Sequence, residues 1–97
     1  MVIGIIGGGA AGMAAALSAS ENPNVQVILM ERQNRVGRKL LATGNGRCNL
    51  SNCNLSVSHY HGKDRQFCQP AFEKYNFENT ISWFEQLGLY TVVESTG

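Results

Sequence analysis

Apolar and polar positions divide the start of the chain into a strand, a helix and a second strand. Residues 2–6 are apolar and mostly β-branched and end in glycines, which predicts a parallel strand buried on both faces. Residues 10–20 are rich in alanine and hold no breaker after Gly12, so we expect a helix. A turn with Pro23 follows, and residues 25–30 repeat the strand pattern. This order of elements predicts a βαβ unit.

The pattern changes after this unit. Residues 32–69 are polar and contain glycines, and loops of such length are uncommon unless they are functional. A helical period then returns, with Asn76 as the expected N-cap and Gly88 as the expected stop. Its apolar positions are Phe77, Ile81, Phe84 and Leu87. Residues 90–94 alternate weakly and suggest a last strand.

The turn between the first strand and the helix carries the pattern G-x-G-x-x-G. Gly7 would permit the tight turn, Gly9 would let a pyrophosphate approach the backbone, and Gly12 would let the helix pack closely on the strand. The helix is expected to begin at Ala10, and its first turn offers unpaired N–H groups and a partial positive charge to phosphates. The spacing predicts a dinucleotide cradle.

An acidic residue ends the second predicted strand. Glu31 lies at the distance from the glycines at which an acid binds the adenosine ribose hydroxyls. A carboxylate there repels a 2′-phosphate and so disfavours NADP, although Arg32 next to it weakens this exclusion. Because strand, glycines, helix, strand and acid occur in order, the sequence favours dinucleotide binding over a merely structural βαβ unit.

A second glycine-containing motif spans residues 37–52 and reads GRKLLATGNGRCNLSN. Its central turn tolerates left-handed backbone conformations and could direct N–H groups at an anion; it consists of Gly44, Asn45 and Gly46. Three basic side chains could supply charge to phosphates or a reduced flavin: Arg38, Lys39 and Arg47. From these residues alone, a loop without a cofactor role remains an equal alternative.

The string MVIGIIGGGAAGMAAA, the acid Glu31 and the second motif together resemble the N-terminus of the BaiN-like NAD(P)/FAD-dependent oxidoreductases. These are also described as the aminoacetone oxidase family of FAD-binding enzymes. A later F-x-x-L-G-L-x-x-x-x-E-x-x-G pattern is similar too, so the resemblance covers the whole chain. It implies an α/β fold with a Rossmann-type, glutathione-reductase-like FAD-binding βαβ unit, followed by a cofactor-facing loop and a helix.

The resemblance also implies which residues contact FAD. Around the ADP portion it places Gly7, Gly9, Ala11, Gly12 and Glu31. Around the pyrophosphate and the flavin it places Arg38, Lys39, Gly44, Asn45, Gly46, Arg47, Cys48 and Asn49. Ala10, at the helix start, and Arg32, beside the acid, complete the candidate contacts. No residue can be assigned as a catalytic acid or base.

The function implied is that of the N-terminal, FAD-binding segment of a flavin-dependent oxidoreductase acting on a small molecule, with NAD(P)H as a candidate electron donor. Proteins of this family are several times longer, so we expect an incomplete domain made of a βαβ unit (about 1–31), a cofactor loop (about 32–69) and a helix with a possible strand (about 70–97). The alternative is a truncated, non-catalytic fragment. Because a Rossmann sheet needs further strands, we expect the segment alone to be poorly soluble or partly folded and not to hold FAD.

Two cysteines offer a different function. Cys48 and Cys53 could form a redox disulfide beside a flavin, as in a disulfide oxidoreductase, although only Cys48 belongs to the family motif. The same cysteines with His59 and His61 could be drawn as zinc ligands, but no C-x-x-C or H-x-x-x-H spacing supports a metal site. We interpret the histidines as surface loop residues rather than acid–base groups.

Charge and composition indicate which classes of binding partner to expect. The formal net charge is +1, which gives no reason to expect nucleic acid or an acidic membrane as a partner. The apolar start lacks a basic n-region and is interrupted by glycines, so it resembles neither a signal peptide nor a membrane span, and we expect a cytoplasmic protein. Basic residues gather in one stretch without acids, which favours an anionic cofactor: Arg32, Arg35, Arg38, Lys39 and Arg47.

Overall fold

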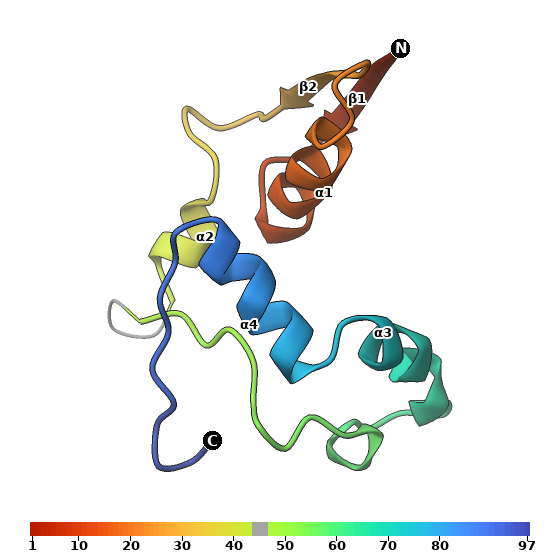
Figure 1. Ribbon diagram of the computed structural model, residues 1–97, viewed down its shortest axis with the longest axis vertical. Helices are drawn as coiled ribbons and strands as arrows, with labels where there is room; N and C mark the ends of the chain where they lie inside the picture. Colours follow the sequence, from red (N-terminus) through yellow and green to blue (C-terminus); the bar gives the residue numbers. More distant parts are fainter. Residues whose placement is uncertain (44–46) are drawn as a thin grey trace. The chain divides into compact units, whose positions relative to one another are not determined.

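The computed structural model describes residues 1–43 and 47–97 (Figure 1). Gly44, Asn45 and Gly46, the centre of the predicted cofactor turn, lie outside the described residues. The chain divides into two compact units, Met1–Asn49 and Leu50–Gly97, which we call the N-terminal and C-terminal units.

The N-terminal unit is built on a parallel pair of strands joined by a helix. Strand β1 (Val2–Ile6) pairs with β2 (Gln26–Met30), and helix α1 (Ala10–Ser20) forms the connection between them. The register pairs Val2 with Gln26 and Ile6 with Met30. Figure 1 shows the two strands side by side with α1 running along them. The sequence prediction of a βαβ unit is confirmed, with β2 beginning one residue later than expected.

The two faces of this strand pair differ in their exposure. Alternate residues are half-buried, and Ile5 among them faces α1, because a Cβ on Gly12 would lie 3.6 Å from its Cγ2. The opposite face is open: Val2 is 60% exposed, Ile6 88% and Ile28 45%. Helix α1 therefore covers one face of the strand pair in the part of the chain that the structure describes, and the other apolar face is open, as expected for a sheet without its further strands.

The segment expected to be a long loop contains short helices. Helix α2 (Arg38–Leu41) lies in the N-terminal unit, and the 3-10 helices η2 (Val57–His59) and η3 (Arg65–Cys68) lie in the C-terminal unit. Helix α3 (Gln69–Lys74) follows directly after η3 and has proline in its first turn, where the missing N–H costs nothing. These helices are too short to show a clear hydrophobic period.

Helix α4 (Phe77–Gln86) begins and ends as the sequence predicts. The Asn76 side-chain oxygen accepts a hydrogen bond from the Asn79 N–H at 2.8 Å, which caps the start. At the other end the Gly88 N–H donates to the Glu85 carbonyl at 2.9 Å, and the Leu89 N–H donates to the Phe84 carbonyl at 3.0 Å. With Gly88 at φ +85°, this pair of bonds is a Schellman motif.

The chain after α4 is irregular. The suggested strand at residues 90–94 is wrong: this stretch has no strand structure, and Tyr90 and Val92 are 85% and 89% exposed. A strand requires a neighbour to pair its backbone groups, and the sheet found among the described residues consists of β1 and β2. Weak alternation in sequence does not supply such a neighbour.

No helix within residues 1–43 and 47–97 is long and apolar enough to cross a membrane.

Candidate cofactor-binding site

The turn between β1 and α1 requires glycine at two positions. Gly7 adopts φ +98°, which other residues rarely do, and its N–H donates to the Met30 carbonyl at 2.8 Å. At Gly12 a Cβ would overlap the carbonyl oxygen of Gly7. The helix thus rests on the turn that precedes it, and the close approach is possible because neither residue carries a side chain.

Gly9 has open space where a side chain would be. No heavy atom lies within 4 Å of a Cβ built there. The first N–H with an acceptor in the helix is that of Met13, which donates to the Gly9 carbonyl at 2.9 Å. The N–H groups of Ala10, Ala11 and Gly12 therefore have no acceptor among the described residues, as is normal for a first turn. Together these features form an anion cradle of the type that holds a pyrophosphate.

The carboxylate of Glu31 lies against the glycine turn. Its Oε2 accepts a hydrogen bond from the Gly8 N–H at 2.7 Å, and its Oε1 accepts one from the Gln33 N–H at 2.8 Å. These bonds, first that from Gln33 and then that from Gly8, lower the pKa of Glu31 below its ordinary value, with a smaller contribution from the charge of Arg32. An ionised carboxylate has about four acceptor positions, so it can still accept bonds from ribose hydroxyls.

Two further glycines shape the site, and the sequence analysis missed both. The backbone N–H of Gly37 donates to the Gly8 carbonyl at 2.8 Å. A Cβ on Gly8 would lie 2.6 Å from Val36 Cγ1, and Gly37 adopts φ +70°. The available signals were the middle glycine of the triplet at residues 7–9, which G-x-G-x-x-G does not need, and the glycine that opens the second motif.

The open side of the turn continues into a groove of about 690 Å³, within the size range of small-molecule sites. Gly9, Ala10 and Glu31 line one part of it, and the loop after β2 lines the rest. Its basic side chains come from Arg32, Arg35, Arg38 and Lys39. Glu31 is the acid among its lining residues, so the groove carries a net positive charge that suits an anionic ligand.

The structure brings some predicted site residues to this groove and leaves others out of it. Gly9, Ala10, Glu31, Arg32, Arg38 and Lys39 line the groove, as does Arg35, which the motif comparison did not include. Gly7 in the turn and Ala11 and Gly12 in the first turn of α1 are next to these residues in the chain but are not among the lining residues. Arg47, Cys48 and Asn49 are exposed and are absent from the lining. Their contact with a cofactor remains a prediction.

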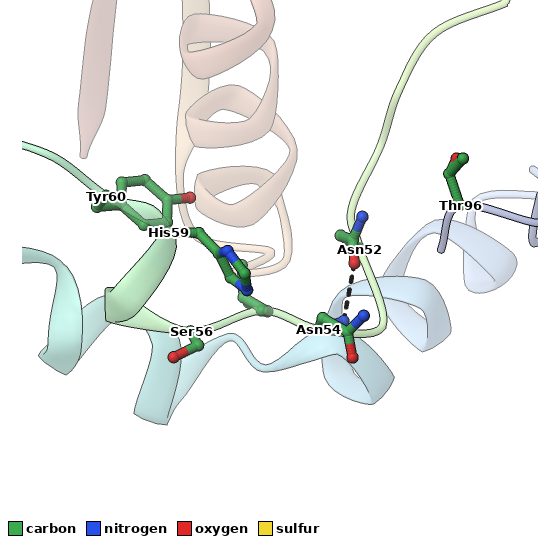
Figure 2. A pocket seen from close by; sticks show the side chains of 7 residues that line it. Asn52, Asn54, Ser56, His59, Tyr60 and Thr96 are labelled. Atoms are coloured by element: carbon green, nitrogen blue, oxygen red, sulfur yellow. Dashed lines mark hydrogen bonds between the residues drawn. The ribbon is translucent and has the colours of Figure 1, made fainter.

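A second, smaller pocket of about 360 Å³ lies in the C-terminal unit (Figure 2). Asn52, Ser56, His59 and Tyr60 are among its lining residues. The Asn52 side chain accepts a hydrogen bond from the Asn54 N–H at 2.8 Å, and the Ser56 hydroxyl accepts one from the Ser58 N–H at 3.3 Å. These are local turn and cap contacts, so the Asn52 and Ser56 side chains have a structural role.

The cysteines are free thiols. Cys48 and Cys53 are exposed, whereas Cys68 is half-buried with its Sγ 3.0 Å from the Arg65 carbonyl oxygen. Within the described ranges, no three His, Cys, Asp or Glu residues lie together as metal ligands would. The redox role considered for Cys48 and Cys53 stays a prediction.

Comparisons with known proteins agree on the kind of domain. A family model described as "HI0933-like protein Rossmann domain" matches residues 1–97. The chain is 44% identical over 90 residues to the 3-dehydro-bile acid delta(4,6)-reductase of Clostridium scindens, which covers 92% of this chain and 22% of the relative. It is 33% identical over 90 residues to the ribosomal RNA dihydrouridine synthase of Escherichia coli, covering 84% of this chain and 22% of that protein. The protein of the same name from Haemophilus influenzae is 31% identical over 85 residues, covering 88% and 21%. The chain thus spans about a fifth of the length of these relatives.

Proposed function

Because this chain belongs to the HI0933-like Rossmann-domain family of BaiN-like, FAD-dependent oxidoreductases, we propose that its groove holds the ADP portion of FAD. The observation that carries this proposal is the open space at Gly9, directly before helix α1. A glycine without any neighbour at its Cβ position is not required by the packing of the protein. A close approach of phosphate to the backbone explains it.

The residues present fit such a cofactor. The N–H groups of Ala10, Ala11 and Gly12 would bind the pyrophosphate, and the remaining acceptor positions of Glu31 would bind the ribose hydroxyls. The basic side chains of the groove, Arg38 and Lys39 among them, would balance the phosphate charge. Bound FAD supplies hydride chemistry, while this segment supplies binding, orientation and charge.

We propose that the parent protein reduces its substrate and draws electrons from NAD(P)H in the cytoplasm. The first relative is named a reductase, and dihydrouridine carries two hydrogens more than uridine, which supports a reducing direction. Glu31, the acid that lines the groove, is a poor candidate to move the substrate proton, since two backbone N–H groups stabilise its ionised form. We therefore expect the acid–base groups to come from other parts of the parent protein.

The names of the relatives indicate two different substrates: one relative acts on a bile acid derivative, and two act on ribosomal RNA. We favour a small molecule, because the relative with the higher identity acts on one and the basic side chains line a confined groove. An RNA substrate is the second candidate, supported by the 33% and 31% identical relatives. Binding of full-length protein to ribosomal RNA at moderate salt, measured by filter retention, separates the two; tight and specific binding would favour RNA.

The test of the cofactor site is Gly9→Ala in the full-length protein. Gly9 has φ −78°, which alanine adopts freely, and the added methyl meets no described protein atom, so the loss of stability should be limited to about 1 kcal/mol, the effect of alanine at a helix N-cap. The methyl would displace the pyrophosphate and cost at least one bond to a charged group, so FAD affinity should fall about tenfold to a hundredfold. Gly4→Ala in β1 is the matched control, because its methyl makes an ordinary 3.4 Å contact with Met30 away from the groove. Equal FAD affinity in both variants would contradict the proposal.

A further inference from the structure

Gly8 and Gly37 are the two buried residues among those the structure describes. They come from different parts of the chain, one from the β1–α1 turn and one from the loop before α2. The Gly37 N–H donates to the Gly8 carbonyl at 2.8 Å, and we call this pairing the Gly8–Gly37 contact. The most enclosed point of the described chain therefore lies where the two halves of the cofactor groove meet.

Side chains close this contact from both sides. Val36 lies over Gly8, where a Cβ would come within 2.6 Å of Val36 Cγ1. Met13 of α1 lies against Gly37, where a Cβ would come within 3.3 Å of Met13 Cε. Gly37 also adopts φ +70°, which is unfavourable for residues with a side chain. The backbone conformation favours glycine at this position, and a side chain there would also have to displace the end of Met13 by a few tenths of an ångström.

The contact completes a ring of hydrogen bonds around the groove. Glu31 accepts bonds from the N–H groups of Gly8 and Gln33, at 2.7 and 2.8 Å. The Gln33 side-chain oxygen accepts one from Arg38 Nη1 at 2.7 Å. Gly37 precedes Arg38 in the chain, and its N–H donates to the Gly8 carbonyl, which closes the ring. The ribose acid, the basic loop and the glycine turn are thus tied to one another.

We propose that Gly37 is a positioning residue, which holds Arg38 and Lys39 against the glycine turn so that the groove is formed before the cofactor arrives. The role in FAD affinity rests on the function proposed above. Without the Gly8–Gly37 contact, the loop after β2 would have to be ordered during binding, and that ordering lowers affinity. Gly37 lies at the groove but has no side chain to offer a ligand, so its effect comes through the residues that follow it.

The experiment compares Gly37→Ala with Gly88→Ala in the full-length protein. Both glycines have positive φ, +70° and +85°, so both variants carry similar backbone strain, but Gly88 ends α4 and has open space at its Cβ position. Gly37→Ala should lower FAD affinity about tenfold, the effect of forcing alanine into a left-handed conformation. Without FAD it should also raise several-fold the rate of trypsin cleavage after Arg35, Arg38 and Lys39. Gly88→Ala should lose thermal stability and change neither readout.

A third variant separates strain from packing. Gly37→Asn tolerates the left-handed conformation better than alanine, so it should recover part of the FAD affinity and part of the resistance to trypsin. Equal effects of Gly37→Ala and Gly88→Ala on FAD affinity, or unchanged cleavage of the loop in Gly37→Ala, would overturn the positioning role. If the wild-type protein binds no FAD while cleavage still rises in Gly37→Ala, the loop contact is supported and the proposed cofactor function fails.

Discussion

The contacts inside the N-terminal unit differ in kind from the contacts inside the C-terminal unit. In the N-terminal unit, hydrogen bonds join distant residues, such as Gly8 with Glu31 and Gly37 with Gly8. In the C-terminal unit, the described side-chain bonds span no more than five residues, as in the caps of α4. One backbone bond, from the Cys53 N–H to the Gly97 carbonyl at 3.2 Å, joins distant segments there.

This difference shows where binding geometry arises. The groove in the N-terminal unit depends on close approaches between backbone segments at Gly8, Gly12 and Gly37. A single methyl group at one of these positions can therefore disturb it. The C-terminal unit is a series of local helix signals, and a substitution there should stay local in its effect. Substitutions in the two units should therefore differ most in whether they change cofactor affinity.

The largest effect should come from Gly12→Ala. The new methyl would overlap the Gly7 carbonyl, which is backbone and cannot move without opening the turn, so the variant should lose about 3 kcal/mol of stability and most FAD binding. Urea unfolding and flavin titration measure both. Ala16→Gly, on the same half-buried face of α1, is the control and should cost about 1 kcal/mol by helix propensity alone. A Gly12→Ala protein as stable as the wild type would disprove the close contact of helix and turn.

Glu31→Ala should be next in size. It removes the acceptor of the Gly8 N–H and the predicted ribose ligand, so FAD affinity should fall about tenfold to a hundredfold. The measurement is FAD retention in equilibrium dialysis. Glu21→Ala, which changes an exposed acid after α1, should retain FAD as the wild type does. Full retention by Glu31→Ala would remove this residue from the site.

A pH titration should show a smaller effect at the same carboxylate. Its pKa is lowered below the ordinary value of 4.5 by the N–H groups of Gln33 and Gly8. The stability that these bonds contribute is therefore present above this value and is lost as the pH falls through the lowered pKa. The unfolding free energies of the wild type and of Glu31→Gln should differ above pH 4.5 and converge once the pH has fallen below the lowered pKa. A difference that stays constant over this range would contradict the assignment.

Asn76→Ala tests the C-terminal unit. Loss of the cap at the start of α4 should cost about 1 kcal/mol of stability, because the Asn79 N–H loses its acceptor. FAD affinity should not change. Asn54→Ala removes a side chain for which no comparable cap bond is seen, and it should be close to neutral in a thermal melt. If Asn76→Ala lowered FAD affinity as much as Glu31→Ala, the separation between the units would not hold.

The smallest effect should come from Cys53→Ser. Cys53 is an exposed, free thiol outside the family motif, so turnover and FAD content of the full-length enzyme should stay close to those of the wild type. The assay is substrate-dependent oxidation of NAD(P)H, together with the flavin spectrum. Loss of turnover with FAD still bound would instead support a redox disulfide with Cys48.

Features set by neighbouring residues could be predicted from the sequence. The strand–helix–strand order follows from runs of apolar residues, and the ends of α4 follow from Asn76 and Gly88. The acid at the end of β2 was predicted from its spacing to the glycines, and the structure places it against the turn. In each case the signal and the structure lie within a few residues or follow a known spacing.

Features that depend on contacts between distant residues could not be predicted from the sequence. Gly37 has no local pattern that shows its bond to Gly8, because that bond depends on how the loop after β2 folds back. The sequence also does not tell which face of the strand pair is open, because an apolar strand looks the same in sequence whether one or both faces are covered. The weak alternation at residues 90–94 had no partner strand to make it a strand.

The open face of the strand pair also bears on how the protein is made. β1 and β2 lie close in sequence and are joined by one short helix, so they can pair soon after both leave the ribosome. From that moment Val2, Ile6 and Ile28 expose apolar side chains to solvent, and such a surface favours aggregation with other unfolded chains. The speed with which later elements cover this face should therefore limit the yield of native protein, and slow translation just after the βαβ unit should lower it.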